Sequence, residues 1–584
     1  SLPAARATLR PMSRLDSLTT GFRSAYVDHA TIERQLAAWH EAFPDLTRLT
    51  TIGTTPEGRA MTVLTIGTDP DRPRPTAWVD GNMHAIELAG TSVALAIAED
   101  FLAAHVEPER LPWSPELIDA ARGVRLFVLP RMSPDGAECV LTSGRYVRSL
   151  PRDDRAVRGA SRWLTGDIDG DGRSLAMRIP DPAGDYVIAS PDHPDLMVAR
   201  EIGDVGPFYR VLPEGTIEHW DGFTVPTPEF NGDNPVDLNR NFPWSWSPAH
   251  EQVGAGRFPT SEIESRAVVE FACAHPEIFA WLNLHCFGGV FIRPLGHGPD
   301  GKLDQTDLAH FKLLEQWAKD TTTYPTVSGY EEFLYAPDKP LHGDLTDFAY
   351  HQRGAFAYVV ELWDLFARLG LPRPKKFVDY YGHLTRADLI KLAAWDREHN
   401  AGRLIQPWLP CEHPQLGKVE VGGIDSRVGY WNPPPELLGE MCAQQSACFV
   451  RVAAMAPSVV VRSATATALG DDLWRVDVVV DNRGYLPTHG LPSAKGLEWN
   501  EPLYADATTV DCALVDPTRV RVALGHLGGW GRGVGAGAND LAYSYSPGSA
   551  ACARGTWLVR GRGQVTVRIG APRVGFVDAI VALT

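Results

Sequence analysis

Short apolar runs typical of buried β-strands alternate with longer runs of helical periodicity in two separate parts of the chain. Buried strands connected by helices form a sheet with helices packed on its faces. The alternation therefore predicts an α/β fold with a mixed, mostly parallel sheet flanked by helices. The expected helices cover residues 30–43, 88–102 and 308–319, and the expected strands cover residues 61–68, 76–80, 124–130, 279–285 and 356–362.

Two segments lack this alternation. Residues from about 151 to 234 are rich in Asp, Gly and Pro with little periodicity, which indicates a loop-rich insertion. From about residue 457 onward, short extended runs alternate with Gly, Pro and Asp turns, the pattern of a β-sandwich. We therefore expect one large domain over residues 17–455, which carries the insertion, and a β-sandwich domain over residues 456–584.

Composition narrows the class of protein. The 584 residues are 44% hydrophobic and carry a net charge of −17, which fits a globular protein with an acidic surface. Such a surface repels phosphate backbones, so we expect no nucleic-acid partner. Because an unbroken run of about 20 apolar residues is missing, we also expect no membrane partner. The eight cysteines contain no CxxC pair and are expected to be buried thiols, with a Cys442–Cys448 disulfide as the alternative.

His84 and Glu87 lie in the run G-N-M-H-A-I-E, directly after an expected strand and directly before an expected helix. Imidazole nitrogen and carboxylate oxygen both suit zinc, and a site with two histidines and one carboxylate leaves a position open for water. An H-x-x-E spacing also arises by chance in a chain with 18 histidines and 72 acidic residues, so its context has to decide.

His285 supplies that context, since it ends an expected buried strand and is followed closely by a pair of glycines. Strand ends that face a cleft are where α/β proteins place their sites. A single histidine at such a position is more often part of the core, but together with His84 and Glu87 it would complete a set of three zinc ligands.

Glu361 interrupts the apolar strand F-A-Y-V-V-E-L-W. A buried ionised carboxylate needs a metal, a cation or a catalytic task, the alternative being a salt bridge at a sheet edge. A further motif, D-L-N-R-N at residues 237–241, contains Arg240, whose planar guanidinium matches a carboxylate, with Asn239 beside it. The motifs of serine hydrolases and of phosphate-binding loops are missing from the sequence.

In order and spacing, these motifs resemble the zinc metallocarboxypeptidase family of the carboxypeptidase A type. The resemblance covers about residues 20–370 and does not reach the C-terminal β domain. The matching pieces are H-A-I-E at 84–87, S-P-D-G at 133–136, Y-V-R-S at 146–149, D-L-N-R-N at 237–241, L-H at 284–285 and V-E-L-W at 360–363.

The resemblance implies a metal centre and a catalytic base. His84, Glu87 and His285 are expected to hold Zn²⁺, and Asp237 is expected to orient His84. Glu361 is expected to act as the general base that activates water at the zinc, and then to pass the proton to the leaving amine.

The resemblance also implies substrate contacts. Arg148 is expected to stabilise the developing oxyanion, while Asn239 and Arg240 bind the terminal carboxylate of the substrate. Tyr335 is the best match to a mobile tyrosine of the family, although its spacing differs. Thr346 falls near the position that lines the side-chain pocket, and its neutral side chain argues against a preference for basic terminal residues.

The insertion contains Asp167, Asp169 and Asp171 in a D-I-D-G-D-G run that resembles the first half of a calcium loop. The acidic residue expected at the twelfth position is missing, because Arg178 stands there. We hold two interpretations, a calcium site or a solvated acidic turn.

The function that we expect is zinc-dependent removal of a C-terminal residue from a peptide or peptide-like substrate with a free carboxylate. The alternatives are an amidase of the same chemistry that acts on a modified or cell-wall peptide, and a binding protein that has lost catalysis. The N-terminus lacks a signal-peptide h-region, whereas the family habit is secretion, so the compartment stays open between secreted and cytoplasmic.

Overall fold

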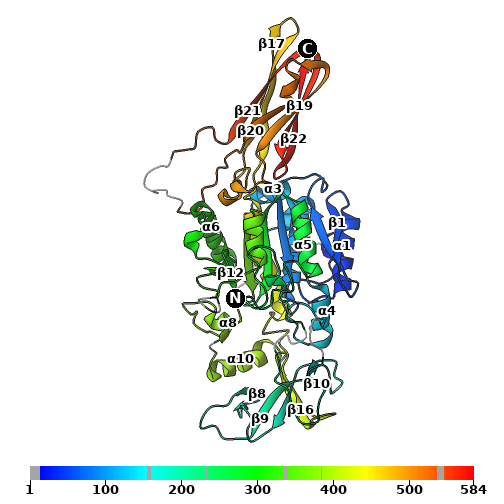
Figure 1. Cartoon of the computed structure of the whole chain (residues 1–584), viewed down its shortest axis with the longest axis vertical. Helices are drawn as coiled ribbons and strands as arrows, with labels where there is room; N and C mark the ends of the chain where they lie inside the picture. The colour runs from blue at the N-terminus through cyan, green and yellow to red at the C-terminus, as the bar shows by residue number, and fades with distance from the viewer. Residues whose placement is uncertain are drawn as a thin grey trace, which may run out of the picture.

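The computed structural model describes residues 14–153, 159–229, 234–334, 336, 339–382, 384–535 and 545–584. Figure 1 shows three parts along the long axis: a central α/β body, a small β lobe at one end and an antiparallel β domain at the other. The C-terminus lies at the far tip of the β domain.

The α/β body is built on an eight-stranded sheet in the order β1-β2-β4-β3-β11-β14-β12-β13. Four of the seven pairings are parallel, namely β3–β4, β3–β11, β11–β14 and β12–β13, which confirms the predicted mixed, mostly parallel sheet. The strands are β1 (Thr47–Thr54), β2 (Ala60–Ile66), β3 (Thr76–Gly81), β4 (Arg125–Leu129), β11 (Ile278–Cys286), β12 (Val290–Arg293), β13 (Thr326–Ser328) and β14 (Phe356–Leu362).

Helices cover this sheet because its central strands are apolar on both faces. Every residue of β3, β4 and β11 is buried, and α2 packs on β3, β4 and β11 with α11 against it. The longer helices are α1 (His29–Ala42), α2 (Ala89–Val106), α3 (Pro115–Gly123), α4 (Pro134–Ser143), α5 (Ile263–Ala274), α6 (Gln305–Thr321), α10 (Arg386–His399) and α11 (Leu438–Ala453).

Helix α2, which extends the helix expected over residues 88–102, is long and apolar enough to cross a membrane by length and composition alone. Most of it is buried inside the protein. Its apolar character is therefore accounted for by its place in the core between the sheet and α11.

The described part of the segment expected to be a loop-rich insertion instead carries six strands. They are β5 (Arg162–Thr165), β6 (Ala176–Pro180), β7 (Tyr186–Ser190), β8 (His193–Ala199), β9 (Phe208–Pro213) and β10 (Gly215–Glu218). β6 to β9 join β15 (Ile405–His413) and β16 (Gly417–Ile424) in one sheet, in the order β15-β16-β6-β9-β7-β8. The prediction was wrong because these strands are short and two of their partners lie about 200 residues further along the chain, so local periodicity carries little of the signal.

The C-terminal part, for which a β-sandwich was expected, forms an antiparallel β domain. Its sheet runs β17-β18-β21-β19-β20, and β22 pairs with β21. β18 and β22 occupy successive halves of one edge of β21, which joins all six strands in one hydrogen-bonded sheet. The strands are β17 (Val459–Gly470), β18 (Leu473–Asn482), β19 (Leu503–Leu514), β20 (Arg521–Gly525), β21 (Cys552–Ala571) and β22 (Gly575–Leu583).

Arg573 connects the β domain to the α/β body. Its side chain is only 1% exposed, and its guanidinium donates to the carbonyl oxygens of Arg353, at 3.0 Å, and of Gly354. Burial, reinforced by the nearby charge of Arg353, lowers the pKa of Arg573 to about 9. The contact therefore places a cation with carbonyl acceptors inside the junction between the two domains.

Candidate metal centre and substrate cavity

The turn between β3 and α2 presents His84 and Glu87 at the carboxyl end of the sheet. Asn82 shapes this turn, because its amide Nδ2 donates to the carbonyl oxygens of His84, at 2.8 Å, and of Ala85, at 3.1 Å. Gly81 allows the close approach of the helix start, since a Cβ at this position would lie 2.5 Å from the carbonyl oxygen of Gly90.

His285 and Glu361 come from the two neighbouring strands of the same sheet. β11 pairs in parallel with β3 on one side and with β14 on the other. His285 is directly paired with Glu361 across β11 and β14, so both side chains leave the sheet on the same face. The carboxyl ends of three adjacent parallel strands thus bring together residues from three distant parts of the sequence.

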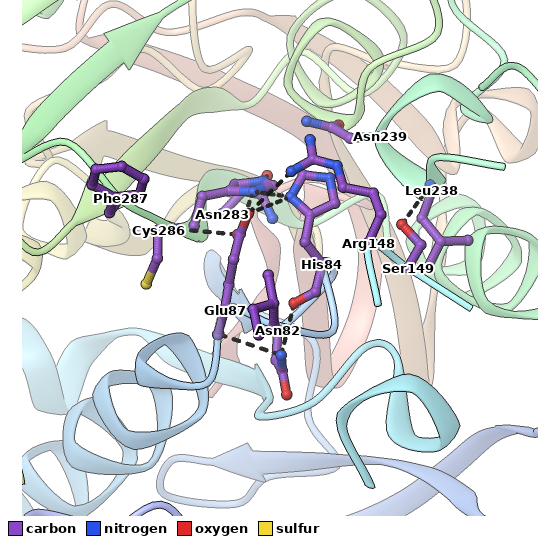
Figure 2. A network of polar contacts seen from close by, with 12 residues as sticks. Asn82, His84, Glu87, Arg148, Ser149, Leu238, Asn239, Asn283, Cys286 and Phe287 are labelled. Atoms are coloured by element: carbon purple, nitrogen blue, oxygen red, sulfur yellow. Dashed lines mark hydrogen bonds and ion pairs between the residues drawn. The ribbon is translucent and has the colours of Figure 1, made fainter. Parts of the chain in front are cut away.

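Three ligand atoms meet at one point. Nδ1 of His84 lies 2.8 Å from Oε1 of Glu87, and Nδ1 of His285 lies 3.0 Å from both Nδ1 of His84 and Oε2 of Glu87. All three residues are buried. Figure 2 shows His84 and Glu87 rising to this shared point, with Arg148 beside them. The structure therefore brings together the three residues that were expected to hold zinc.

The surrounding hydrogen bonds leave His84, His285 and Glu87 facing one another with acceptor atoms only. Nε2 of His84 faces Oδ1 of Asp237 at 3.0 Å, so the ring donates there and keeps a lone pair on Nδ1. His285 does the same through Nε2 to the amide oxygen of Asn283. A carboxylate has no proton to donate, so two imidazole lone pairs and Glu87 face one another. Three acceptors that face one another with no proton between them suit a cation such as Zn²⁺ and would be unfavourable without one.

A second layer of contacts fixes the ring of His285. Asn283 is held through its amide Nδ2, which donates to Asp80, and this contact turns its oxygen toward His285. Asp80 is buried and also accepts from the indole nitrogens of Trp78, at 2.6 Å, and Trp281, at 2.8 Å. Burial raises the pKa of Asp80 to about 6 in spite of these donors. Sequence reasoning missed this chain of contacts, because only the alternation within β11 places Asn283 beside His285.

The carboxylates of the centre have opposite electrostatic surroundings. Burial works to raise the pKa of Glu87, but the positive charges that His84 and His285 carry when their rings are protonated, together with their hydrogen bonds to the carboxylate, outweigh it and bring the pKa to about 2. Burial and the nearby charge of Glu87 raise the pKa of Glu361 well above its ordinary value, although Arg148 opposes the shift. Glu87 is thus suited to remain ionised as a ligand, and Glu361 is suited to hold and release a proton.

Arg148 is tied to the same centre. Its Nε donates to Oδ2 of Asp237 at 3.1 Å, and its Nη1 lies 3.4 Å from Oε1 of Glu87. For Asp237, burial is outweighed by Arg148 and His84, which hold its pKa well below the usual range. The guanidinium is therefore held beside the metal ligands by a carboxylate that stays ionised.

A small cavity of about 80 Å³ opens next to the centre. Its lining includes Arg148, His285 and Glu361 together with Asn239 and Arg240. The Asn239 amide oxygen accepts from the backbone N–H of Leu345 at 2.9 Å, so the group that this side chain can still offer is its NH₂ donor. The cavity thus combines the metal centre with the two residues that were expected to bind a carboxylate.

Thr346 lines this cavity as expected, but Asp344 lines it as well. Both residues are buried, and Oγ1 of Thr346 and Oδ2 of Asp344 have no hydrogen-bond partner. Burial, with the neighbouring charge of Asp347, raises the pKa of Asp344 to about 7. Sequence reasoning considered Thr346 alone and missed Asp344, which the three-residue helix α7 (Leu345–Asp347) brings to the same wall.

The remaining predicted site residues are Tyr335 and the three aspartates of the possible calcium loop. Tyr335 lies outside the described residues. Asp167 and Asp169 lie together with Glu214, whereas the carboxylate of Asp171 accepts from Arg173 at 2.7 Å. The carboxylate of Asp167 accepts from backbone N–H groups of its own loop, and the geometry gives no support for a calcium ion.

Comparison with known proteins points in the same direction as the geometry. A family model described as zinc carboxypeptidase matches residues 32–163 and 229–385. The chain belongs to the zinc carboxypeptidase family. Residues 458–582 match a family that is described only as a domain of unknown function.

Individual relatives are distant. Carboxypeptidase E of Caenorhabditis elegans is 28% identical over 159 residues, which are 27% of this chain and 30% of that protein. Carboxypeptidase A4 of Mus musculus is 23% identical over 355 residues, which are 60% of this chain and 62% of that protein. The chain thus spans less than two thirds of either relative. The solved structure of carboxypeptidase A from Helicoverpa armigera is 19% identical with a TM-score of 0.38, and covers 58% of this chain and 65% of that one.

Proposed function

We propose that this chain is a zinc-dependent carboxypeptidase, which hydrolyses the C-terminal amide bond of a peptide or peptide-like substrate. One observation carries the proposal: Nδ1 of His84, Nδ1 of His285 and the carboxylate of Glu87 converge as acceptors within 3.0 Å. Beside them lies a cavity that Glu361 and Arg240 line. A metal ligand set, a base and a carboxylate receptor in one place are the requirements of this reaction.

His84, Glu87 and His285 would hold the zinc ion, with Asp237 keeping His84 in the required tautomer. When bound, zinc supplies a Lewis acid that polarises the scissile carbonyl and acidifies water. Glu361 would take the proton of the attacking water and deliver it to the leaving amine, a role that its raised pKa favours.

The substrate would be bound through the negative charge of its terminal carboxylate. Arg240 and the NH₂ group of Asn239 would bind the terminal carboxylate, which restricts cleavage to the end of a chain. Arg148 would donate to the carbonyl oxygen of the scissile bond as negative charge develops there. Because Arg148 is already oriented by Asp237, this stabilisation costs little reorganisation.

The proposal also assigns a role to each of the two domains. Residues 17–455 would form the catalytic domain, in which the β lobe is an elaboration of the cleft rim. Residues 456–584 would form an accessory domain at one end of the long axis, and the described residues of this domain contribute none to the cavity lining.

The experiment is a comparison of Glu361→Gln with the wild type for release of a terminal amino acid, with metal analysis of both proteins. We expect the variant to keep its zinc and to lose turnover by about 10²–10⁴-fold, as removal of a general base should cause. Unchanged turnover would remove Glu361 from the mechanism. A wild type that binds no zinc would contradict the proposal as a whole.

A further inference from the structure

His297, Asp347 and His351 form a second group of potential metal ligands, which shares no residue with the zinc centre. Each of the three side chains offers one ligand atom, and these atoms lie within 4.8 Å of one another. Asp347 also belongs to the lining of the small cavity, whereas the two histidines do not. The group therefore lies beside the substrate cavity and outside the catalytic centre.

One helical segment and one loop bring these side chains together. Asp347 ends α7, and His351 lies in the π-helix η5 (Phe348–Gln352), which follows directly. Residues four apart in a helix lie on the same face, so this segment presents a carboxylate and an imidazole side by side. His297 comes from the loop after β12, and its Nδ1 lies 2.9 Å from Oδ2 of Asp347. The segment includes a π-helical turn, a rare feature that is frequent at functional sites.

The carboxylate of Asp347 is fixed in position by the backbone. Its side chain is only 1% exposed. The backbone N–H of Gly296 donates to both of its oxygens, at 3.2 Å to Oδ1 and 3.1 Å to Oδ2. Carboxylates that bind metals are typically held by hydrogen bonds of this kind. Asp347 is thus a preformed acceptor with one imidazole already beside it.

The ring of His351 is fixed without hydrogen bonding of its Nε2. This atom is buried and has no hydrogen-bond partner among the described residues, whereas most buried polar groups in proteins are paired. The ring stacks on the indole of Trp244, with centroids 4.3 Å apart and planes at 17°, and the ring of His297 lies 5.3 Å away. An ion pair between His297 and Asp347 accounts for two of the three residues, but an ion bound to all three also accounts for His351.

The ligand atoms define the class of metal. Two imidazoles and one carboxylate suit Zn²⁺, Ni²⁺ and Cu²⁺, whereas Ca²⁺ and Mg²⁺ prefer a shell made of oxygen atoms. The side chain of His297 is 28% exposed, so an ion can reach the group from solvent and complete its coordination with water.

We propose that His297, Asp347 and His351 form a second metal site, which binds Zn²⁺ or a similar divalent transition metal. This inference goes beyond the proposed function, because none of the three residues takes part in the proposed hydrolysis. Since Asp347 lines the substrate cavity, the bound ion links the cavity wall to the loop after β12.

The test is equilibrium dialysis of the full chain against Zn²⁺, followed by metal analysis. The variants are His297→Gln and His351→Gln, and the matched control is His250→Gln, because the His250 side chain is 77% exposed and belongs to neither group of ligands. We expect about two zinc ions per chain in the wild type and the control, and about one in each variant.

The affinity for the second ion should fall by about 100-fold or more in each variant, because loss of an outer partner alone costs about 10–100-fold. Variants that bind as many zinc ions as the wild type, with unchanged affinities, would overturn the inference. Ca²⁺ that displaces the second zinc ion at equal concentration would contradict the assigned ligand class.

Removal of a catalytic ligand separates this inference from the proposed function. We expect His285→Gln to retain the second ion and the double variant His285→Gln/His351→Gln to lose it. A His285→Gln protein that binds no zinc would reject the second site. A wild type whose only zinc is lost on His351→Gln would instead count against the proposed function alone.

A fluorescence measurement on well-folded protein complements the histidine variants. Cu²⁺ quenches nearby indoles, and the ring of His351 stacks on Trp244. In the His285→Gln background, Cu²⁺ should therefore quench more fluorescence when Trp244 is present than in Trp244→Phe. Equal quenching with and without Trp244 would contradict binding at this site.

Discussion

His285 and Glu361 are direct partners across the parallel strands β11 and β14. The register of one strand pair therefore sets the position of a metal ligand relative to the base. Since a shift by one residue would turn either side chain to the opposite face of the sheet, the buried apolar faces of both strands protect the site geometry. The catalytic arrangement thus depends on the same packing that stabilises the fold.

Asp237 is expected to tune metal affinity without touching the metal. The variant Asp237→Asn loses the carboxylate that orients His84 and Arg148. We expect zinc affinity to fall by about 10–100-fold, measured by competition with a chelator. Asp221→Asn is the control, because the Asp221 carboxylate caps a surface loop of the lobe. Equal zinc affinity in wild type and Asp237→Asn would contradict the assigned role.

Arg240 is expected to recognise the terminal carboxylate. Arg240→Gln should reduce kcat/KM for free-acid substrates by about 100-fold, the loss of a charge-assisted contact, while its effect on amidated substrates should be small. Arg266→Gln is the matched control, since Arg266 is exposed and donates only to nearby backbone oxygens. Equal losses on both substrate types would instead favour a general amidase.

Asp344 is expected to make the preference for the terminal residue depend on pH. With its pKa raised to about 7, the carboxyl is neutral below pH 7 and negative above it. The ratio of kcat/KM for lysine-terminated over leucine-terminated substrates should therefore rise by about tenfold from pH 6 to pH 8. Asp344→Asn should abolish that rise. A ratio that falls with pH, or one that persists in the variant, would contradict the role of Asp344.

Arg573 is expected to contribute to the stability of the domain junction. Arg573→Met removes a buried guanidinium and leaves the carbonyl oxygens of Arg353 and Gly354 without their donor. We expect the free energy of unfolding to fall by about 2–4 kcal/mol, seen as a lower Tm in calorimetry. Arg562→Met is the control, because Arg562 forms an exposed ion pair with Asp472. Equal Tm changes in the two variants would contradict this account.

The sequence predicts the centre of the site well because each part has a strong local signal. His84 and Glu87 lie between an apolar strand and an apolar helix, and His285 and Glu361 end or interrupt apolar strands. Strand ends of a parallel sheet converge, so local patterns are enough to bring these residues together. The roles of the individual residues remain predictions that the variants above test.

The sequence does not predict the surroundings of the site equally well. Asp344 enters the cavity through a single helical turn, and Asn283 is apparent only from its place beside His285. The β lobe depends on pairing between β6 and β16, which are separated by more than 200 residues and have no shared local pattern. Non-local strand pairing is the part of this fold that periodicity cannot show.

The most direct test of the central claim is anomalous diffraction at the zinc absorption edge, recorded from crystals of the full chain grown with zinc. The account predicts an anomalous peak within about 2.0–2.2 Å of Nδ1 of His84, Nδ1 of His285 and a carboxylate oxygen of Glu87. The absence of a peak among these three residues, with zinc present in the crystal, would contradict it.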